Sequence, residues 1–303
     1  MKTALKLNVP ADFHLRNTIM SHGWCELPPF HTDHEANVLR RVLTLPSGKV
    51  VLVSISDAEG SLALDVEHRQ KLSSKDEADI KHQTSDCLRL NENYQTFYTV
   101  IGKHKQFAWV AEIRAGRLLR SPSVFEDLVK MLCTTNCNWG ATEKMVGSLV
   151  RLCGTHFRDD YYAFPTPKQL LGLSEKFFRE EIRLGYRAPY LIEMVESINN
   201  GQLDVESWKH SNLPTPELYK ELRKVKGIGD YAAGNILKLL GRYDYLAIDS
   251  WCRMKFSKLR KRGKPVDDEM IAAYYAKYKE WQGLFMWMDV TKDWYEKGRP
   301  SQS

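Results

Sequence analysis

The residues with the clearest chemical potential lie between positions 222 and 249. Gly227-Ile228-Gly229 separates a helical pattern that ends near Val225 from a second one that begins directly after the glycines. Two glycines permit a tight turn that another surface can approach closely, and the N–H groups at the start of the next helix favour an anion. Asp249 follows an apolar run at a predicted helix start, where it is either a plain N-cap or a fixed carboxylate for chemistry.

Positive charge is concentrated around the same segment. The whole chain has 44 Lys and Arg against 38 Asp and Glu, a net charge of +6. Residues 221–265, which include Arg253, hold 12 of these basic residues and four acids, a net charge of +8. Such a block is either a solvated helical surface or a surface that meets phosphates.

Composition excludes several classes of protein. The 303 residues suffice for two domains, and 43% hydrophobic content indicates a globular chain. We expect no membrane span, since no apolar run reaches about 18 residues, and no secretory signal. The cysteines form no C-x-x-C pair, which argues against an iron–sulfur cluster and favours reduced thiols in an intracellular protein. They are Cys25, Cys87, Cys133, Cys137, Cys153 and Cys252.

The elements that must position these residues fall into two regions. Alternating or β-branched runs bounded by turn residues predict strands at 38–45, 50–55, 61–66 and 106–113, with a polar helix at 74–88. From Ser121 onward the apolar spacing is helical. We therefore predict an α+β domain over residues 1–118, a helical domain over 119–303, and a disordered tail after Lys297.

The hairpin together with Asp249, 18 positions after Tyr231, resembles the helix-hairpin-helix, Gly/Pro-rich loop, Asp (HhH-GPD) superfamily of DNA glycosylases, although residues 241–246 lack the usual proline. Three further segments, 131–138, 163–165 and 184–190, resemble its 8-oxoguanine glycosylase branch, so that the ordered match runs from about residue 121 to 288. The resemblance implies an N-terminal antiparallel-sheet domain like that of the TATA-binding protein, followed by an all-α glycosylase domain.

The resemblance also implies residue roles. Asp249 would be the catalytic carboxylate, which stabilises positive charge on the sugar as the glycosidic bond breaks. Tyr186 would wedge into the base stack, Asn136 would fill the space of the flipped nucleotide, and Arg187 would hold the widowed partner base. Contacts with the DNA are expected from Gly227, Gly229 and Arg253.

Tyr231 is the most informative departure. Bifunctional members of the superfamily carry a lysine at this place, whose amine forms a Schiff base with the sugar, whereas a phenol cannot. The 3-methyladenine glycosylase II branch has a tryptophan there, so we expect a monofunctional enzyme. Asn235 replaces the cysteine of the 8-oxoguanine branch, and aromatic side chains favour cationic, alkylated purines. The expected base pocket comprises Tyr231, Asn235, Trp251 and Phe285.

The remaining expectations concern partners and alternatives. We expect a monomer that binds double-stranded DNA with a damaged base, in the cytoplasmic nucleoid of a bacterium or the nucleus of a eukaryote. No cofactor is required, but backbone carbonyls of the hairpin would hold potassium or sodium, at Arg223, Val225 and Ile228. Two alternatives stay open: a glycosylase for oxidised or mismatched bases, and a non-catalytic protein that binds damaged DNA.

Overall fold

The computed structural model describes residues 1–298 and begins with a five-stranded antiparallel sheet in the order β1-β5-β4-β3-β2. Only Gly298 of the expected tail lies within the described residues. The strands of this sheet are β1 (Lys2–Asn8), β2 (Phe30–Asp33), β3 (Val38–Thr44), β4 (Val50–Ala58) and β5 (Ser61–His68), and a small second sheet pairs β6 (His156–Arg158) with β7 (Tyr161–Tyr162).

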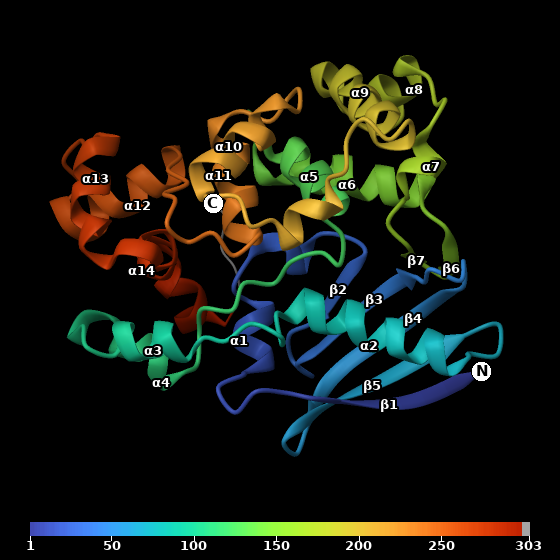
Figure 1. Ribbon diagram of the computed structural model, residues 1–303, viewed down its shortest axis with the longest axis horizontal. Coiled ribbons are helices and arrows are strands. Elements are labelled where there is room, and N and C mark those ends of the chain that lie inside the picture. Colours follow the sequence, from blue (N-terminus) through green and yellow to red (C-terminus); the bar gives the residue numbers. More distant parts are fainter. Residues whose placement is uncertain (299–303) are drawn as a thin grey trace.

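The centre of the sheet is buried by its own sequence pattern. Val51, Leu52 and Val53 of β4 are fully buried, and Val53 pairs with Val66 of β5. Helix α2 (Ser74–Leu88) runs across one face of the sheet (Figure 1) and starts with a reciprocal capping box between Ser73 and Asp76. This confirms the predicted antiparallel sheet and the predicted helix at 74–88.

A helical region follows the sheet and packs beside it (Figure 1). The α-helices are α1 (Leu15–Ile19), α3 (Gln95–Ile101), α4 (Ala108–Glu112), α5 (Val124–Thr134), α6 (Trp139–Cys153), α7 (Pro167–Leu170), α8 (Glu175–Glu180), α9 (Ala188–Asn199), α10 (Thr215–Lys224), α11 (Asp230–Leu239), α12 (Ser250–Lys261), α13 (Asp268–Tyr275) and α14 (Gln282–Lys297). Short 3-10 turns are η1 (Gly23–Glu26), η2 (Lys105–Phe107), η3 (Gly185–Arg187), η4 (Glu206–His210) and η5 (Ala276–Trp281).

The strand predicted at 106–113 is wrong, because this segment forms η2 and α4. Phe107 and Val110 are spaced for one helix face, and both are fully buried in a cluster with α12 and α14. The N-terminal half therefore ends in helices that pack on the C-terminal helices and do not extend the sheet. The domain boundary near residue 118 stays a prediction.

A second feature joins the sheet to the helices through charge. Arg41 of β3 donates to Glu126 of α5 at 2.9 Å, and the Lys130 ammonium lies 2.8 Å from the other carboxylate oxygen. None of these side chains is more than 3% exposed. We call Arg41, Glu126 and Lys130 the sheet-side ion cluster.

Candidate active site

A cleft of about 1280 Å³ opens where the α10–α11 hairpin, the start of α12 and the loop after α5 converge. Exposure falls steadily from its rim to its floor: Tyr186 is 44% exposed at the rim, whereas Trp287 is 6% and Trp24 only 1% exposed at the floor. A cavity with a wet rim and a dry aromatic floor suits a flat ligand that enters from a larger polar partner.

The predicted hairpin is present, and its two glycines have different functions. Gly227 has a φ of +84°, and a Cβ there would come within 2.8 Å of Tyr190 and Leu132 side-chain atoms. Gly229 has a φ of −80°, and a Cβ there would meet only Arg223, at 3.5 Å. Gly227 is thus required by internal packing, whereas Gly229 leaves the outer side of the turn open.

The start of α11 has free backbone donors. No side chain caps this helix, so its first N–H groups point to the cleft side without a partner from a capping residue. Together with the partial positive charge of the helix end, they form a surface suited to a phosphate.

Asp249 lies at the cleft as the N-cap of α12. Its Oδ1 accepts a hydrogen bond from the Cys252 N–H at 2.6 Å, which fixes the side chain. The carboxylate also lines the cleft, and the side chain of Cys252 forms a second contact with it. Asp249 is therefore a helix cap whose carboxylate also lines the cleft, and its role in chemistry stays a prediction.

Tyr231 stands beside Asp249 in the first turn of α11. Burial chiefly raises the pKa of its phenol to about 12, with a smaller contribution from the Asp249 charge and an opposing one from a hydrogen bond with Thr134. The hydroxyl thus stays protonated at neutral pH. One turn later Asn235, 6% exposed, donates to the Tyr231 carbonyl at 2.9 Å and also lines the cleft.

The rim brings together two predicted residues from distant parts of the chain. Asn136, with a φ of +48°, donates from Nδ2 to the Tyr186 hydroxyl at 3.2 Å. Both side chains are exposed and both line the cleft. This pairing places a flat ring and an amide at the mouth of the cavity.

Arg187 does not reach the cleft. It is 6% exposed, and its Nε donates to the Leu132 carbonyl at 3.1 Å and to the Thr135 hydroxyl at 3.2 Å. Its predicted contact with a widowed base does not fit this geometry, because its donors are used to shape the loop that carries Asn136.

Phe285 does not line the cleft either, although it was predicted to belong to the base pocket. It is fully buried and stacks on Tyr278 with the ring centroids 3.9 Å apart. This places it in the core formed by α3, α4 and α12–α14. Trp251, in contrast, lies at the cleft as predicted, with its ring 6.1 Å from that of Trp287.

Sequence reasoning missed most of the floor. The His22 ring stacks on Trp287 at 5.6 Å and meets the edge of Trp24 at 4.3 Å. Trp24 is held in place because its Nε1 donates to Asp127 at 2.7 Å. These residues come from the N-terminal region, where the run Ser21-His22-Gly23-Trp24 is the only sequence signal, and it has no periodicity.

Lys238 lies directly behind this floor. It is 3% exposed, and its ammonium sits 3.4 Å from the centroid of the Trp287 ring. The side chain has no hydrogen-bond partner among the described residues. Burial lowers its pKa to about 8. The sequence analysis counted Lys238 only as part of the basic block, and its burial removes it from any phosphate-binding surface.

The rest of the basic block is partly neutralised. Arg253 lines the cleft and forms a two-pronged ion pair with Asp268 at 2.6 and 2.9 Å. Lys226 pairs with Glu193 at 2.6 Å. Four cations that have no ion pair within residues 1–298 gather at the end of α12 and in the loop after it: Lys258, Lys261, Arg262 and Lys264.

Two of the three carbonyls expected to hold a monovalent cation already have other partners. The Val225 carbonyl accepts from the Ile228 N–H at 3.0 Å, and the Ile228 carbonyl faces the Arg223 guanidinium at 3.5 Å. A cation here would meet a positive charge, so the residues present do not fit it well. No step of the proposed reaction depends on such a cation.

In residues 1–298 no three His, Cys, Asp or Glu side chains converge as metal ligands, and no helix has the length and apolarity needed to cross a membrane.

Solved structures share this fold over almost the whole chain. A 3-methyladenine DNA glycosylase from Archaeoglobus fulgidus superposes with a TM-score of 0.75 at 19% identity, over 97% of this chain and 99% of that one. MBOgg1, solved with a low-affinity DNA ligand, gives a TM-score of 0.74 at 20% identity, over 98% and 96% of the chains.

An 8-oxoguanine glycosylase/lyase from Clostridium acetobutylicum, solved with double-stranded DNA containing cytosine opposite 8-oxoguanine, gives a TM-score of 0.69 at 22% identity, over 94% and 93% of the chains. No protein-family model and no curated protein sequence matches the chain. The chain shares the fold of these DNA glycosylases, which confirms the expected sheet domain followed by helices.

Proposed function

We propose that this protein is a monofunctional DNA glycosylase of base-excision repair. One observation carries the proposal: Asp249 and Tyr231 stand side by side in a cleft bordered by an open hairpin turn. The carboxylate can stabilise a positively charged sugar, and the neighbouring position lacks the amine needed for a covalent intermediate. The likeness to solved glycosylases supports the fold on which this chemistry would operate.

The rim would bring the target nucleotide out of the duplex. Phosphates would rest on the free N–H groups at the Gly229 side of the hairpin, while the exposed Tyr186 ring enters the base stack. Stacking of this kind is worth about 1–3 kcal/mol per base, which offsets part of the cost of unstacking. Asn136, hydrogen-bonded to Tyr186, would occupy the space that the nucleotide leaves.

Hydrolysis would follow with water as the nucleophile. As the N-glycosidic bond lengthens, positive charge develops on the sugar, and the carboxylate of Asp249 would stabilise it. Because the Tyr231 phenol stays protonated, it would donate a hydrogen bond and would not attack carbon. The product is an abasic site in an intact strand.

The class of damaged base is the finer part of the proposal. Trp24, Trp251 and Trp287 supply the aromatic surface that a cationic alkylated purine prefers, while Asn235 offers an amide to a base edge. The alternative substrate, an oxidised base, is neutral. A non-catalytic DNA-binding protein would have no need of a carboxylate that lines the cleft, which disfavours that alternative.

Duplex oligonucleotides with single defined lesions test the proposal. The panel should include 7-methylguanine, 8-oxoguanine and an undamaged control, each analysed with and without hot alkali and with borohydride. We expect base release that becomes a strand break only after alkali, and no borohydride-trapped adduct. An alkali-independent break with a trapped adduct would show a lyase instead.

A further inference from the structure

Lys238 is a buried amine for which the proposed hydrolysis has no use. It lies seven residues after Tyr231, on the face of α11 that also carries Asn235 into the cleft. Its ammonium covers the Trp287 ring at 3.4 Å without a hydrogen bond from any described residue. A lysine buried only for packing would normally be paired with a carboxylate.

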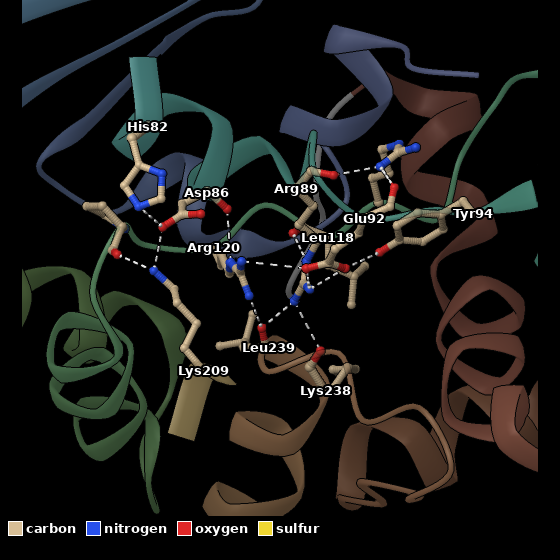
Figure 2. A network of polar contacts seen from close by, with 12 residues as sticks. His82, Asp86, Arg89, Glu92, Tyr94, Leu118, Arg120, Lys209, Lys238 and Leu239 are labelled. Carbon is tan, nitrogen blue, oxygen red and sulfur yellow. Dashed lines mark hydrogen bonds and ion pairs between the residues drawn. The ribbon is translucent and has the colours of Figure 1, made fainter. Parts of the chain in front are cut away.

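The backbone that carries this amine is held by a network at the end of α11. Figure 2 shows Arg89, which is 1% exposed, donating to the carbonyls of Lys238, at 3.2 Å, and of Leu239. Arg89 is itself held by Glu92 at 2.7 Å, and Arg120 reaches the Leu239 carbonyl at 3.3 Å. The helix end therefore cannot carry Lys238 away from the floor without breaking this network.

His22 and Cys252, which lie near Lys238, are uncharged, so Lys238 is the group behind the floor whose charge changes with pH. Burial, and then the charge of Lys238, lowers the pKa of His22 well below its usual value, so this ring is neutral. Burial raises the pKa of the Cys252 thiol on α12, which stays protonated. Burial also lowers the pKa of Lys238 to about 8, against the opposing effects of Cys252 and Asp249. At pH 7 the amine is mainly an ammonium.

We propose that Lys238 acts as a charge filter at the cleft floor: it excludes positively charged bases and favours neutral bases that leave as anions. The inference rests on the proposed glycosylase activity, and it replaces the alkylated purine of that proposal with a neutral damaged base. A cationic base that stacks on Trp287 from the cleft would lie close to the ammonium that already contacts this ring from behind. Like charges in a dry site repel strongly. This reverses the preference for alkylated purines that the aromatic residues alone suggest.

The charge of the departing base explains why Lys238 would favour neutral bases. When the bond between the sugar and the base nitrogen breaks, its electron pair goes to the base, and water supplies hydroxide to the sugar. A neutral base leaves as an anion, takes up the proton of that water, and is stabilised meanwhile by the nearby ammonium. An alkylated, cationic base leaves as a neutral molecule and gains nothing from it. Lys238 is a positioning residue in this scheme, since it acts through the field behind Trp287.

The test removes the charge and keeps the shape. Lys238→Met is compared with wild type and with Lys75→Met, which removes an exposed charge at the start of α2 on the sheet. Excision of 8-oxoguanine and of 7-methylguanine from otherwise identical duplexes is measured at pH 7. We expect the ratio of kcat/KM for the cationic over the neutral base to rise about tenfold or more in Lys238→Met and to stay unchanged in Lys75→Met.

A binding experiment keeps the filter separate from the proposed enzyme activity. Dissociation constants of 9-methyladenine and of the fixed cation 7,9-dimethyladeninium are measured by quenching of tryptophan fluorescence. Wild type should prefer the neutral base at pH 7 and lose this preference by pH 9, whereas Lys238→Met should show no such pH dependence. This wild-type profile is informative even if the variant fails to fold.

The outcomes are distinct. If no duplex is cleaved but the binding preference responds to pH and to Lys238→Met, the filter stands and the proposed enzyme is wrong. If cleavage occurs and both ratios are unchanged in Lys238→Met, or if all substrates decline equally with lowered stability, Lys238 is only a packing residue and the filter is overturned.

Discussion

Two buried lysines in this molecule occupy opposite kinds of surroundings. In the sheet-side ion cluster, Lys130 lies 2.8 Å from the Glu126 carboxylate, which Arg41 also contacts. At the cleft floor, Lys238 lies over the Trp287 ring with no hydrogen bond to any described residue. Burial lowers the pKa of both amines, but only Lys130 has a carboxylate partner at contact distance to oppose it.

The difference distinguishes a buried charge that stabilises the packing from a buried charge that can act on a ligand. A cluster whose charges satisfy one another fixes one packing arrangement and offers nothing to a ligand. A buried amine with no carboxylate at contact distance keeps its field directed at the cavity beside it. Burial alone therefore does not mark a functional lysine, whereas burial without an ionic partner next to a cleft does. The following experiments test this contrast in decreasing order of expected effect.

The sheet-side ion cluster should govern stability and not activity. Glu126→Gln would leave Arg41 and Lys130 buried without their anion, and this should lower the free energy of unfolding by about 3–5 kcal/mol. Urea denaturation measures the loss. The fraction that remains folded should excise bases at the wild-type rate, and a selective loss of catalysis would blur the distinction between the two regions.

The cleft should show the reverse pattern at Asp249. Asp249→Asn should slow base release about a hundredfold, roughly 2.7 kcal/mol, because the amide lacks the charge that stabilises the sugar cation. Stability should hardly change, since Asn caps a helix as well as Asp does and can still accept from Cys252. Single-turnover excision and thermal melting measure the two effects. A variant that keeps more than about a tenth of the rate would reduce Asp249 to a helix cap.

The stability of Lys238→Met should depend on pH. The pKa of the lysine is about 8 in the folded chain against 10.5 for a free side chain, so the unfolded chain binds more protons between these values. The wild type should therefore gain stability as pH rises through this window, by at most about 3 kcal/mol. Lys238→Met should be more stable than wild type at pH 7, with the difference shrinking toward pH 10. A constant difference across this range would contradict a strained, unpaired ammonium.

The rim should respond to the stability of the target base pair. Tyr186→Ala should slow excision from a stable pair about tenfold more than from a mismatch, where less unstacking is required. Tyr186→Phe keeps the ring and loses only the hydrogen bonds of the hydroxyl with Asn136 and Thr135, so it should lie close to wild type. A fluorescent base beside the lesion reports flipping directly. Equal losses in both contexts would make Tyr186 a packing residue.

The smallest effect is expected at the hairpin surface. Gly229→Val fits the fold, because its φ is ordinary and its nearest neighbour is a side-chain tip, but it would keep a DNA strand away from the turn. Affinity for undamaged duplex should fall a few-fold, and its slope against salt should become shallower by about 0.9 for each phosphate that the variant no longer neutralises. An unchanged affinity and slope would place the DNA elsewhere on the protein.

Much of this arrangement could be predicted from local patterns. The three strands from 38 to 68, the helix at 74–88, the hairpin and Asp249 all have signals within a short window, either periodicity or a turn residue at a defined place. The segment 106–113 misled because its apolar spacing fits a short strand as well as a helix, and only its packing against α14 decides between them.

The cleft floor could not be predicted in the same way. His22 and Trp24 reach it from a region more than 200 residues before Trp287, and nothing in the local sequence indicates that approach. Phe285 and Trp287 lie two residues apart on one helix, yet one faces the core and the other the cleft. The ionic partners of Lys130 and the isolation of Lys238 likewise depend on which elements meet in space.

The packing at Gly227 fixes the distance between the hairpin and the exposed Tyr186 ring. Its backbone rests against Leu132 and Tyr190, and these flank the loop and the turn that carry Asn136 and Tyr186. The hairpin and the exposed Tyr186 ring are consequently held at a fixed distance from each other by this packing. Under the proposed function, such a protein would keep a constant offset along the double helix between the bound phosphate and the displaced nucleotide. It would therefore inspect DNA one nucleotide at a time. The spacing of the nucleotides would set each step, because the distance between the hairpin and the Tyr186 ring does not change.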